Sequence, residues 1–219
     1  MGMPITIDIP DCDDNQVFET AFERLRQINE RFSTYKPDSE VSQFAAGKIA
    51  EEDLSSELKS VIKACRQAEA KTDGYFSAWA GGAFDPSGYV KGWAIAEVGN
   101  VVEGSGFKTF SIGAAGDILC RSDSQKVWQI GIQNPRHKSK ILDVLSITNA
   151  AVCTSGNYER GAHIIDPKTK KPADGLLSVT ISGPDIIWAD VLATACFAMG
   201  TVKAEAFIKS QPNYQAIIV

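Results

Sequence analysis

The sequence predicts an α+β fold in which a mostly antiparallel sheet is packed with helices. Segments with helical spacing and segments with strand alternation are interspersed without regular βαβ order, and several neighbouring strands are placed to pair antiparallel. The 219 residues suit one domain or at most two, and 44% of them are hydrophobic, which is enough for a sizeable core. No internal repeat, low-complexity tract or long linker divides the chain. We therefore expect residues 1–219 to form a single domain.

The first half of the chain is expected to be mainly helical. Apolar residues recur there every three or four positions, between residues that commonly begin or end helices. The expected elements are a strand over 5–9, a helix over 17–32, a short helix over 39–47, a helix from 55 or 56 to 74, and a helix that includes 90–101 and ends at 104 or 106.

The second half is expected to supply most of the sheet. Apolar and polar residues alternate in several short segments, as in half-buried strands. The expected elements are a strand at 110–112 that runs on into 113–118, a hairpin of strands 128–132 and 141–147, an apolar run that stops at 154, a strand at 177–181, helices over 186–199 and 204–209, and a last strand over 214–219.

Charge and cysteine usage exclude several classes of partner. The net charge is -5 and the pI is about 5.1, which argues against nucleic acid and anionic membrane surfaces. The five cysteines show neither metal-ligand nor CxxC spacing, and their odd number favours a reducing compartment. We see no signal peptide and no apolar run of membrane-spanning length, so we expect no membrane insertion and a cytoplasmic location.

The stretch from Tyr75 to Gly92 is the most glycine-dense part of the chain. Asp85-Pro86-Ser87-Gly88 has the chemistry of a turn that leads into the next helix. One interpretation is a plain helix-entry loop. The other is an anion cradle, with backbone N–H groups at the helix N-terminus and Lys91 close by. The spacing favours neither.

The helix expected over 186–199 carries two polar residues within an almost wholly apolar or small sequence. Asp190 and Thr194 are four positions apart and therefore share a face. A buried carboxylate needs a cation or good hydrogen bonds, and a threonine hydroxyl one turn away adds a second hard oxygen of the kind that Mg²⁺ binds. The alternative, a capped or solvent-facing Asp190, fits the apolar surroundings less well.

The stretch from Ala151 to Pro167 ends an apolar run in two hydroxyl residues and a glycine, followed by His163, one of two histidines in the chain. By itself, this segment favours a hairpin with a polar turn and a partly buried histidine. Tyr35, on the loop after the first long helix, leaves two interpretations open. It could stack on a flat ligand or close an edge of the core.

Five stretches, taken together and in this order, resemble the ApbE-type flavin transferases (FAD:protein FMN transferases), and the similarity spans nearly the whole chain. They are FSTYKPDSE at Phe32–Glu40, DPSGYVKGWA at Asp85–Ala94, AGD at Ala115–Asp117, AVCTSGNYERGAHIIDP at Ala151–Pro167 and ADVLATACFAMG at Ala189–Gly200. Two features depart from the family pattern: Ala115 stands where a glycine is usual, and the segment around 79–84 is compressed.

The resemblance implies an activity and a site. It implies a fold related to the T-fold, with FAD and Mg²⁺ (or Mn²⁺) bound and the FMN half transferred through a phosphoester bond to a Ser or Thr of an acceptor flavoprotein, releasing AMP. Carried onto the matching positions, it implies His163 as the base, a flavin-nucleotide site of Tyr35, Asp85, Lys91, Asp117, Thr154, Ser155 and Gly156, and a metal site of Gly88, Asp190 and Thr194. Two alternatives stay open, an FAD pyrophosphatase that makes FMN and AMP and a non-catalytic flavin-binding protein.

Overall fold

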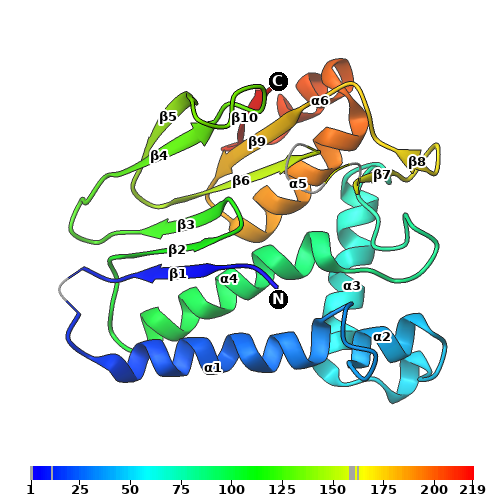
Figure 1. Cartoon of the computed structure of the whole chain (residues 1–219), viewed down its shortest axis with the longest axis horizontal. Coiled ribbons are helices and arrows are strands. Elements are labelled where there is room, and N and C mark those ends of the chain that lie inside the picture. Colours follow the sequence, from blue (N-terminus) through cyan, green and yellow to red (C-terminus); the bar gives the residue numbers. More distant parts are fainter. Residues whose placement is uncertain (1, 11, 158–160, 162) are drawn as a thin grey trace.

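A six-stranded antiparallel sheet with helices packed on one face forms the body of the molecule (Figure 1). This computed structural model describes residues 2–10, 12–157, 161 and 163–219. The strand order is β1-β2-β3-β6-β9-β10, and each neighbouring pair is antiparallel. The predicted α+β class and mostly antiparallel sheet are confirmed.

The described elements follow the chain in the order expected from the sequence, with short additions. The strands are β1 (Ile5–Asp8), β2 (Phe110–Ala114), β3 (Asp117–Arg121), β4 (Trp128–Gln133), β5 (Ile141–Ile147), β6 (Ala150–Gly156), β7 (Ile165–Asp166), β8 (Lys171–Pro172), β9 (Ser178–Gly183) and β10 (Gln215–Ile218). The helices are α1 (Asn15–Phe32), α2 (Glu40–Ala45), a 3₁₀ turn (Glu51–Asp53), α3 (Ser56–Lys71), α4 (Ser87–Gly104), α5 (Ile186–Met199) and α6 (Thr201–Ile208). In the described part of the chain, no helix has the combined length and apolarity needed to cross a membrane.

The peripheral helices form because their sequences are amphipathic and capped. In α1, Asp14 accepts a hydrogen bond from the N–H of Gln16, and the buried residues Val17, Ala21, Leu25, Ile28 and Phe32 recur at helical spacing. Ser39 and Ser55 cap α2 and α3 in the same way. Each of these helices therefore buries one stripe and leaves the opposite face in water.

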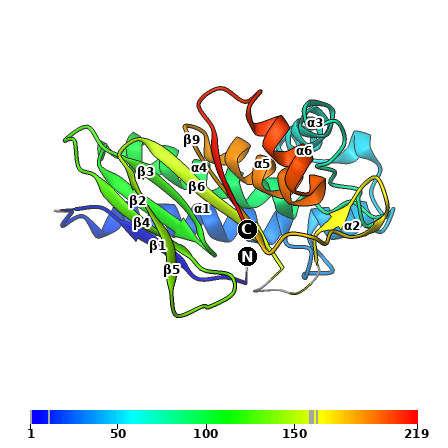
Figure 2. The same cartoon turned by 90° about the horizontal axis from the view of Figure 1, so that it is seen from above.

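Helix α5 lies at the centre of the molecule and is buried on most sides. Its sequence is apolar nearly all round, and it packs on β6, β9 and α4 (Figure 2). The approach to α4 is close at Gly92, where an added Cβ would lie 2.9 Å from the carbonyl oxygen of Ile186 and 3.1 Å from the Cβ of Asp190. Only a residue without a side chain fits this helix crossing unchanged.

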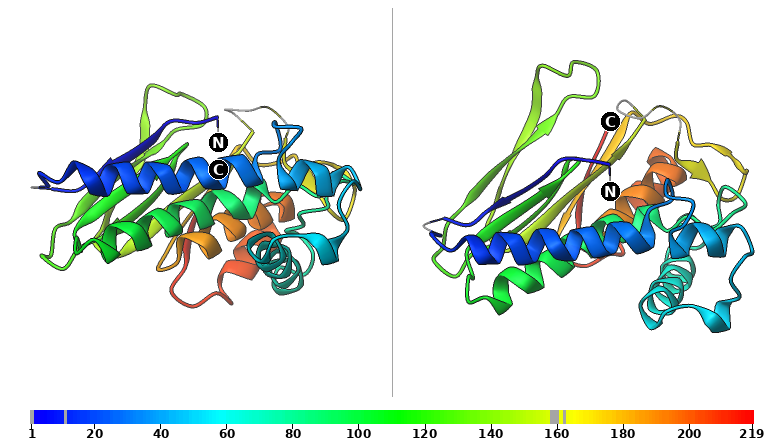
Figure 3. Two further views of the ribbon diagram at one scale, coloured as in Figure 1. Left: turned by 90° about the horizontal axis from the view of Figure 1, so that it is seen from below. Right: turned by 60° about the horizontal axis from the view of Figure 1, so that its bottom comes forward.

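The predicted β4–β5 hairpin is confirmed, and it lies over the sheet face opposite to the helices (Figure 3). Ile130 and Ile132 of β4 pack there on Cys120 of β3 and Val152 of β6, which form a second, smaller core. A β-bulge between Ile132 and Gln133 shifts the pairing near the hairpin loop. Both faces of the sheet centre are thus covered.

Two segments differ from the expectation. The expected strand through 110–118 is a β2–β3 hairpin, because Ala115 (φ 48°) and Gly116 (φ 91°) both adopt the positive φ of a type I′ turn. The expected hairpin at 151–167 does not form: β6 pairs with β3 and β9, whereas the next strand, β7, pairs with β8. Since β6 is buried along most of its length, a central place in the sheet suits it better than a hairpin.

Candidate functional site

A buried ion cluster lies where α4, α5 and the sheet meet. The Nζ of Lys91 is 2.7 Å from Oδ2 of Asp117 and 3.4 Å from Oδ1 of Asp190. The Lys91 side chain is 18% exposed, and both carboxylates are buried. One ammonium therefore faces two carboxylates in a place where water screens little of their interaction.

Backbone hydrogen bonds fix the two carboxylates. Oδ1 of Asp117, at the start of β3, accepts the N–H of Thr154 at 3.1 Å, and Oδ2 of Asp190, on α5, accepts the N–H of Gly92 at 3.0 Å. The cluster thereby joins two strands and two helices that are far apart in the sequence. It also settles the alternative left open for Asp190, which is neither a helix cap nor solvent-facing.

The surroundings shift the protonation of this cluster. Burial raises the pKa of Asp190 to about 7, with the Lys91 charge and the Gly92 N–H opposing and Asp117 adding to the rise. Burial opposes the charge on Lys91, but Asp190 and Asp117 outweigh it and raise the Lys91 pKa above its usual value. Lys91 therefore stays a cation, and burial disfavours the charged form of Asp190.

Hydroxyl groups gather beside the ion cluster at the end of β6. The Oγ of Ser155 and the Oγ1 of Thr194 lie 3.2 Å apart, and Thr194 is one turn after Asp190 on α5. An added Cβ on Gly88, at the start of α4, would lie 3.7 Å from Thr194 Oγ1. The three residues predicted to hold the metal, Gly88, Asp190 and Thr194, therefore come from neighbouring parts of α4 and α5.

This donor set suits a hard cation that keeps other ligands. In the described residues, no group of three or more His, Cys, Asp or Glu side chains could hold a metal ion. The site offers one carboxylate, Asp190, and the hydroxyls of Thr194 and Ser155. Mg²⁺ commonly takes one or two protein carboxylates and completes its shell with water and substrate phosphate, so these residues could hold it together with a bound nucleotide.

His163 follows β6 on the long connection to β9, and its side chain is exposed rather than partly buried. Its Nδ1 is 2.9 Å from the carbonyl oxygen of Gly161. Because a carbonyl can only accept, this contact requires the proton on Nδ1 and leaves Nε2 free to accept one. Four neighbours in the same motif, at 158–160 and 162, lie outside the described residues.

The other predicted nucleotide contacts lie around the same end of the sheet. Oδ1 of Asp85 accepts hydrogen bonds from the N–H and the hydroxyl of Ser87, the first residue of α4. Tyr35, on the loop between α1 and α2, is 89% exposed and does not close the core. Gly156 is the last residue of β6, opposite Ser178 of β9. In Figure 1, α2, α3 and the β7–β8 hairpin gather at this end of the molecule.

Two features near the site escaped sequence reasoning. The first is Thr180 of β9. Its buried hydroxyl lies 2.8 Å from the hydroxyl of Thr154, so this contact links the end of β6 to β9. Strand pairing brings these threonines together. The alternation of residues in β9 could have predicted only on which face of the sheet Thr180 lies.

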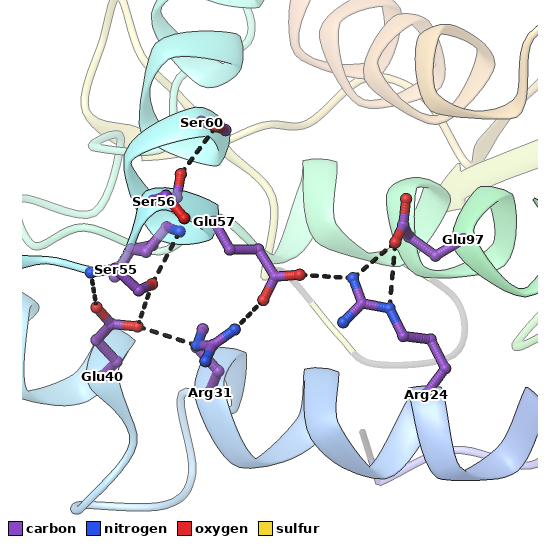
Figure 4. A network of polar contacts seen from close by, with 9 residues as sticks. Arg24, Arg31, Glu40, Ser55, Ser56, Glu57, Ser60 and Glu97 are labelled. Atoms are coloured by element: carbon purple, nitrogen blue, oxygen red, sulfur yellow. Dashed lines mark hydrogen bonds and ion pairs between the residues drawn. The ribbon is translucent and has the colours of Figure 1, made fainter. Parts of the chain in front are cut away.

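The second is a charged network between the helices (Figure 4). Arg24 and Arg31 of α1 both pair with Glu57 of α3, and they reach Glu97 of α4 and Glu40 of α2 respectively. Glu40 also accepts the backbone N–H and the hydroxyl of Ser55, next to α3. The seven-residue spacing of the two arginines signals one shared helix face, but their partners are set by tertiary packing. The network anchors both ends of the loop that carries Tyr35.

Comparison with known proteins gives one consistent result. A family model described as the ApbE family matches residues 1–85 and 79–218. An FAD:protein FMN transferase of Treponema pallidum is 36% identical over 125 residues, covering 52% of this chain and 34% of that protein. One of Vibrio cholerae is 23% identical over an alignment of 262 positions, covering 91% of this chain and 78% of that protein. The Treponema alignment thus spans about a third of that relative's length.

Solved structures share the fold. The flavin transferase ApbE of Vibrio cholerae superposes with a TM-score of 0.85 at 20% identity, covering 100% of this chain and 90% of that one. The ApbE protein of Thermotoga maritima gives 0.83 at 23% identity, covering 99% of this chain and 90% of that one. At these identities the superpositions establish the common architecture.

Proposed function

The chain belongs to the ApbE family, and we propose on that premise that it is an FAD:protein FMN transferase. It would move the FMN half of FAD to a Ser or Thr hydroxyl of an acceptor flavoprotein, with Mg²⁺ bound and AMP released. The observation that carries the proposal is the convergence of Lys91 and its two buried carboxylates with the Ser155 and Thr194 hydroxyls at one end of the sheet. Charge and hydroxyl donors of this kind suit a pyrophosphate.

The proposed reaction exchanges one phosphorus–oxygen bond for another. The acceptor hydroxyl attacks the phosphorus on the FMN side, and its proton passes to Nε2 of His163. The phosphoanhydride bond to AMP breaks, and AMP leaves with the bonding electron pair. The contact between Nδ1 and the Gly161 carbonyl supports the role of His163, because it leaves Nε2 as the ring nitrogen that can take the proton.

The other residues would bind and orient. Lys91 and the bound metal together would balance negative charge on the pyrophosphate, and Asp117, which is buried and bound to Lys91, would hold that ammonium in place. Hydroxyl and N–H groups of Thr154, Ser155 and Gly156 would contact phosphate oxygens. Asp190, Thr194 and a backbone oxygen at Gly88 would hold Mg²⁺, which, when bound, adds positive charge where the anhydride breaks.

The Mg²⁺ requirement, the Ser or Thr target and AMP release can be tested in one assay. The purified chain is incubated with FAD and a flavoprotein domain that has a single acceptor hydroxyl, in a series of divalent metals. We expect the acceptor to gain the mass of FMN minus water, with one AMP per modified acceptor, only when a divalent metal is present. No mass gain with any metal would refute the proposal.

The exposure of His163 favours one alternative, an FAD pyrophosphatase. Water can reach an exposed imidazole as readily as an acceptor hydroxyl can, and the products would be FMN and AMP. In the same assay without acceptor, FAD hydrolysis as fast as transfer would support this alternative.

A further inference from the structure

We propose that a cleft between the β4–β5 hairpin and the edge strand β10 binds an extended segment of the acceptor polypeptide. The cleft has a volume of about 640 Å³, and its apolar lining includes Leu142 of β5, Leu176 before β9, and Ile217 and Ile218 of β10. The inference rests on the proposed function, because it identifies where the proposed acceptor docks.

One wall of the cleft is a sheet edge whose backbone is available for pairing. The N–H of Val219 donates to the carbonyl of Ser178 at 3.0 Å, and the Val219 carbonyl accepts from Leu177 at 2.7 Å. Because such groups alternate along an antiparallel strand, those of Ile218 and Ala216 point away from β9. In the described part of the chain, no strand pairs with that side of β10. An open edge of this kind is a template for an added strand.

The opposite wall, which consists of Arg136, Leu142 and Asp143 of the hairpin, leaves an apolar side chain in water. Strand β5 pairs with β4 alone among the described strands, and Leu142, which lines the cleft, is 41% exposed. Apolar side chains left in water on an unpaired strand mark a surface that a partner covers. An extended peptide could cover both the open edge of β10 and the exposed apolar side chains, because its backbone would pair with the edge and its alternate side chains would fill the cleft.

The cleft lies two strands away from the candidate site, which argues for an acceptor as its occupant. Ser155 of β6 pairs with Val179 of β9, and Val179 pairs with Ile218 of β10. Two strand spacings therefore separate Ser155 from Ile218, about 10 Å. Val179 is fully buried between them, so a peptide seated on β10 would pass the end of β9 to present a hydroxyl at the site. The connection that supplies Leu176 also carries His163.

Steady-state kinetics of two matched variants test the proposal. Leu142→Asp places a charge in the cleft, whereas Val144→Asp places it on β5 outside the cleft, at a residue that is 52% exposed. The probe is the acceptor domain that the wild-type chain flavinylates. For Leu142→Asp we expect KM for the acceptor to rise at least about tenfold, while KM for FAD stays within about twofold. Val144→Asp should change neither value.

A third variant, Ala216→Pro, removes an outward N–H of β10 without touching the bonds to β9, and should also raise KM for the acceptor. Melting temperatures of the three variants establish that each is folded. An unchanged acceptor KM in Leu142→Asp, or an equal rise in Val144→Asp, would overturn the docking site. A dimer that Leu142→Asp converts to a monomer without changing KM would assign the cleft to a second copy instead. Absence of transfer by the wild type would refute the proposed function itself.

Discussion

At the scale of single residues, Lys91 is the group on which the site depends most. Its ammonium contacts one carboxylate from the sheet and one from α5, and it reaches solvent with 18% of its side chain. A cation in this position is held before any substrate arrives. That pre-organisation is what a site for a charged phosphoanhydride needs.

The Lys91–Asp117 pair should show strong energetic coupling. Lys91→Met leaves two buried carboxylates without their cation, so we expect it to lower the free energy of unfolding by about 2–4 kcal/mol, whereas Asp117→Asn leaves Lys91 paired with Asp190 and should cost less. The double variant should lose less than the sum, with a coupling energy of about 1–3 kcal/mol measured by urea denaturation. Strictly additive losses would show that the two groups act independently.

Ala115 holds a backbone conformation that suits glycine better. Its φ of 48° lies in the left-handed region, which costs an L-residue about 1–2 kcal/mol. Ala115→Gly removes that strain at some entropic cost to folding, so we expect a net gain in stability of about 0.5–1 kcal/mol in the same urea assay. A loss of stability would mean that the turn does not have this geometry.

At the scale of elements, the site depends on how closely α4 and α5 approach. Gly92 sits at their crossing and also donates its N–H to Asp190, so packing and site geometry are fixed at one position. A shift of either helix would move Asp190 relative to Lys91. The stretch for which the sequence left a helix entry and an anion cradle open leads into the start of α4, where Asp85 accepts the N–H of Ser87.

Gly92→Ala should therefore be destabilising although alanine favours helices. The added Cβ would lie 2.9 Å from the Ile186 carbonyl oxygen, and we expect a loss of about 1–3 kcal/mol by thermal or urea unfolding. Gly99→Ala, on the same helix, is the matched control. Its Cβ would meet the movable Leu119 side chain at 3.1 Å, so the change should be near neutral. Equal effects at the two positions would contradict the close crossing.

Much of the element order could be predicted because local signals were strong. Serine and aspartate caps, helical stripes and the β4–β5 hairpin all rest on residues near one another in the chain. The β2–β3 turn was missed because alanine rarely adopts positive φ. The position of β6 between β3 and β9 was not predicted, because the sequence of a buried apolar strand does not indicate which segments about 30 residues away pair with it.

The candidate site was predictable only in part for the same reason. The residue types and their local spacing pointed to Asp190 and Thr194, whereas the roles of Lys91 and His163 came from the resemblance to the ApbE family. Their mutual arrangement depends on the sheet register and on the α4–α5 crossing, which no local pattern encodes. The sequence likewise held no sign that Asp117 would serve as the buried partner of Lys91.

At the scale of the whole molecule, the candidate site residues lie at one end of the sheet, and the unpaired edge of β10 lies beside them. Strands β6, β9 and β10 bring Ser155, Val179 and Ile218 into one row, so the candidate site and the acceptor cleft are neighbours across the same sheet. Helices α4 and α5, which carry Lys91 and Asp190, pack against this sheet (Figure 1). A transferase that must bind a dinucleotide and a polypeptide at once would use both surfaces.

The intact mass of an acceptor domain after incubation with FAD and Mg²⁺ tests the central claim most directly. The wild-type chain should add one FMN group, whereas His163→Ala should slow that transfer by at least about a hundredfold, the usual contribution of a general base, while FAD affinity stays within about threefold. Transfer by His163→Ala at the wild-type rate would contradict the account.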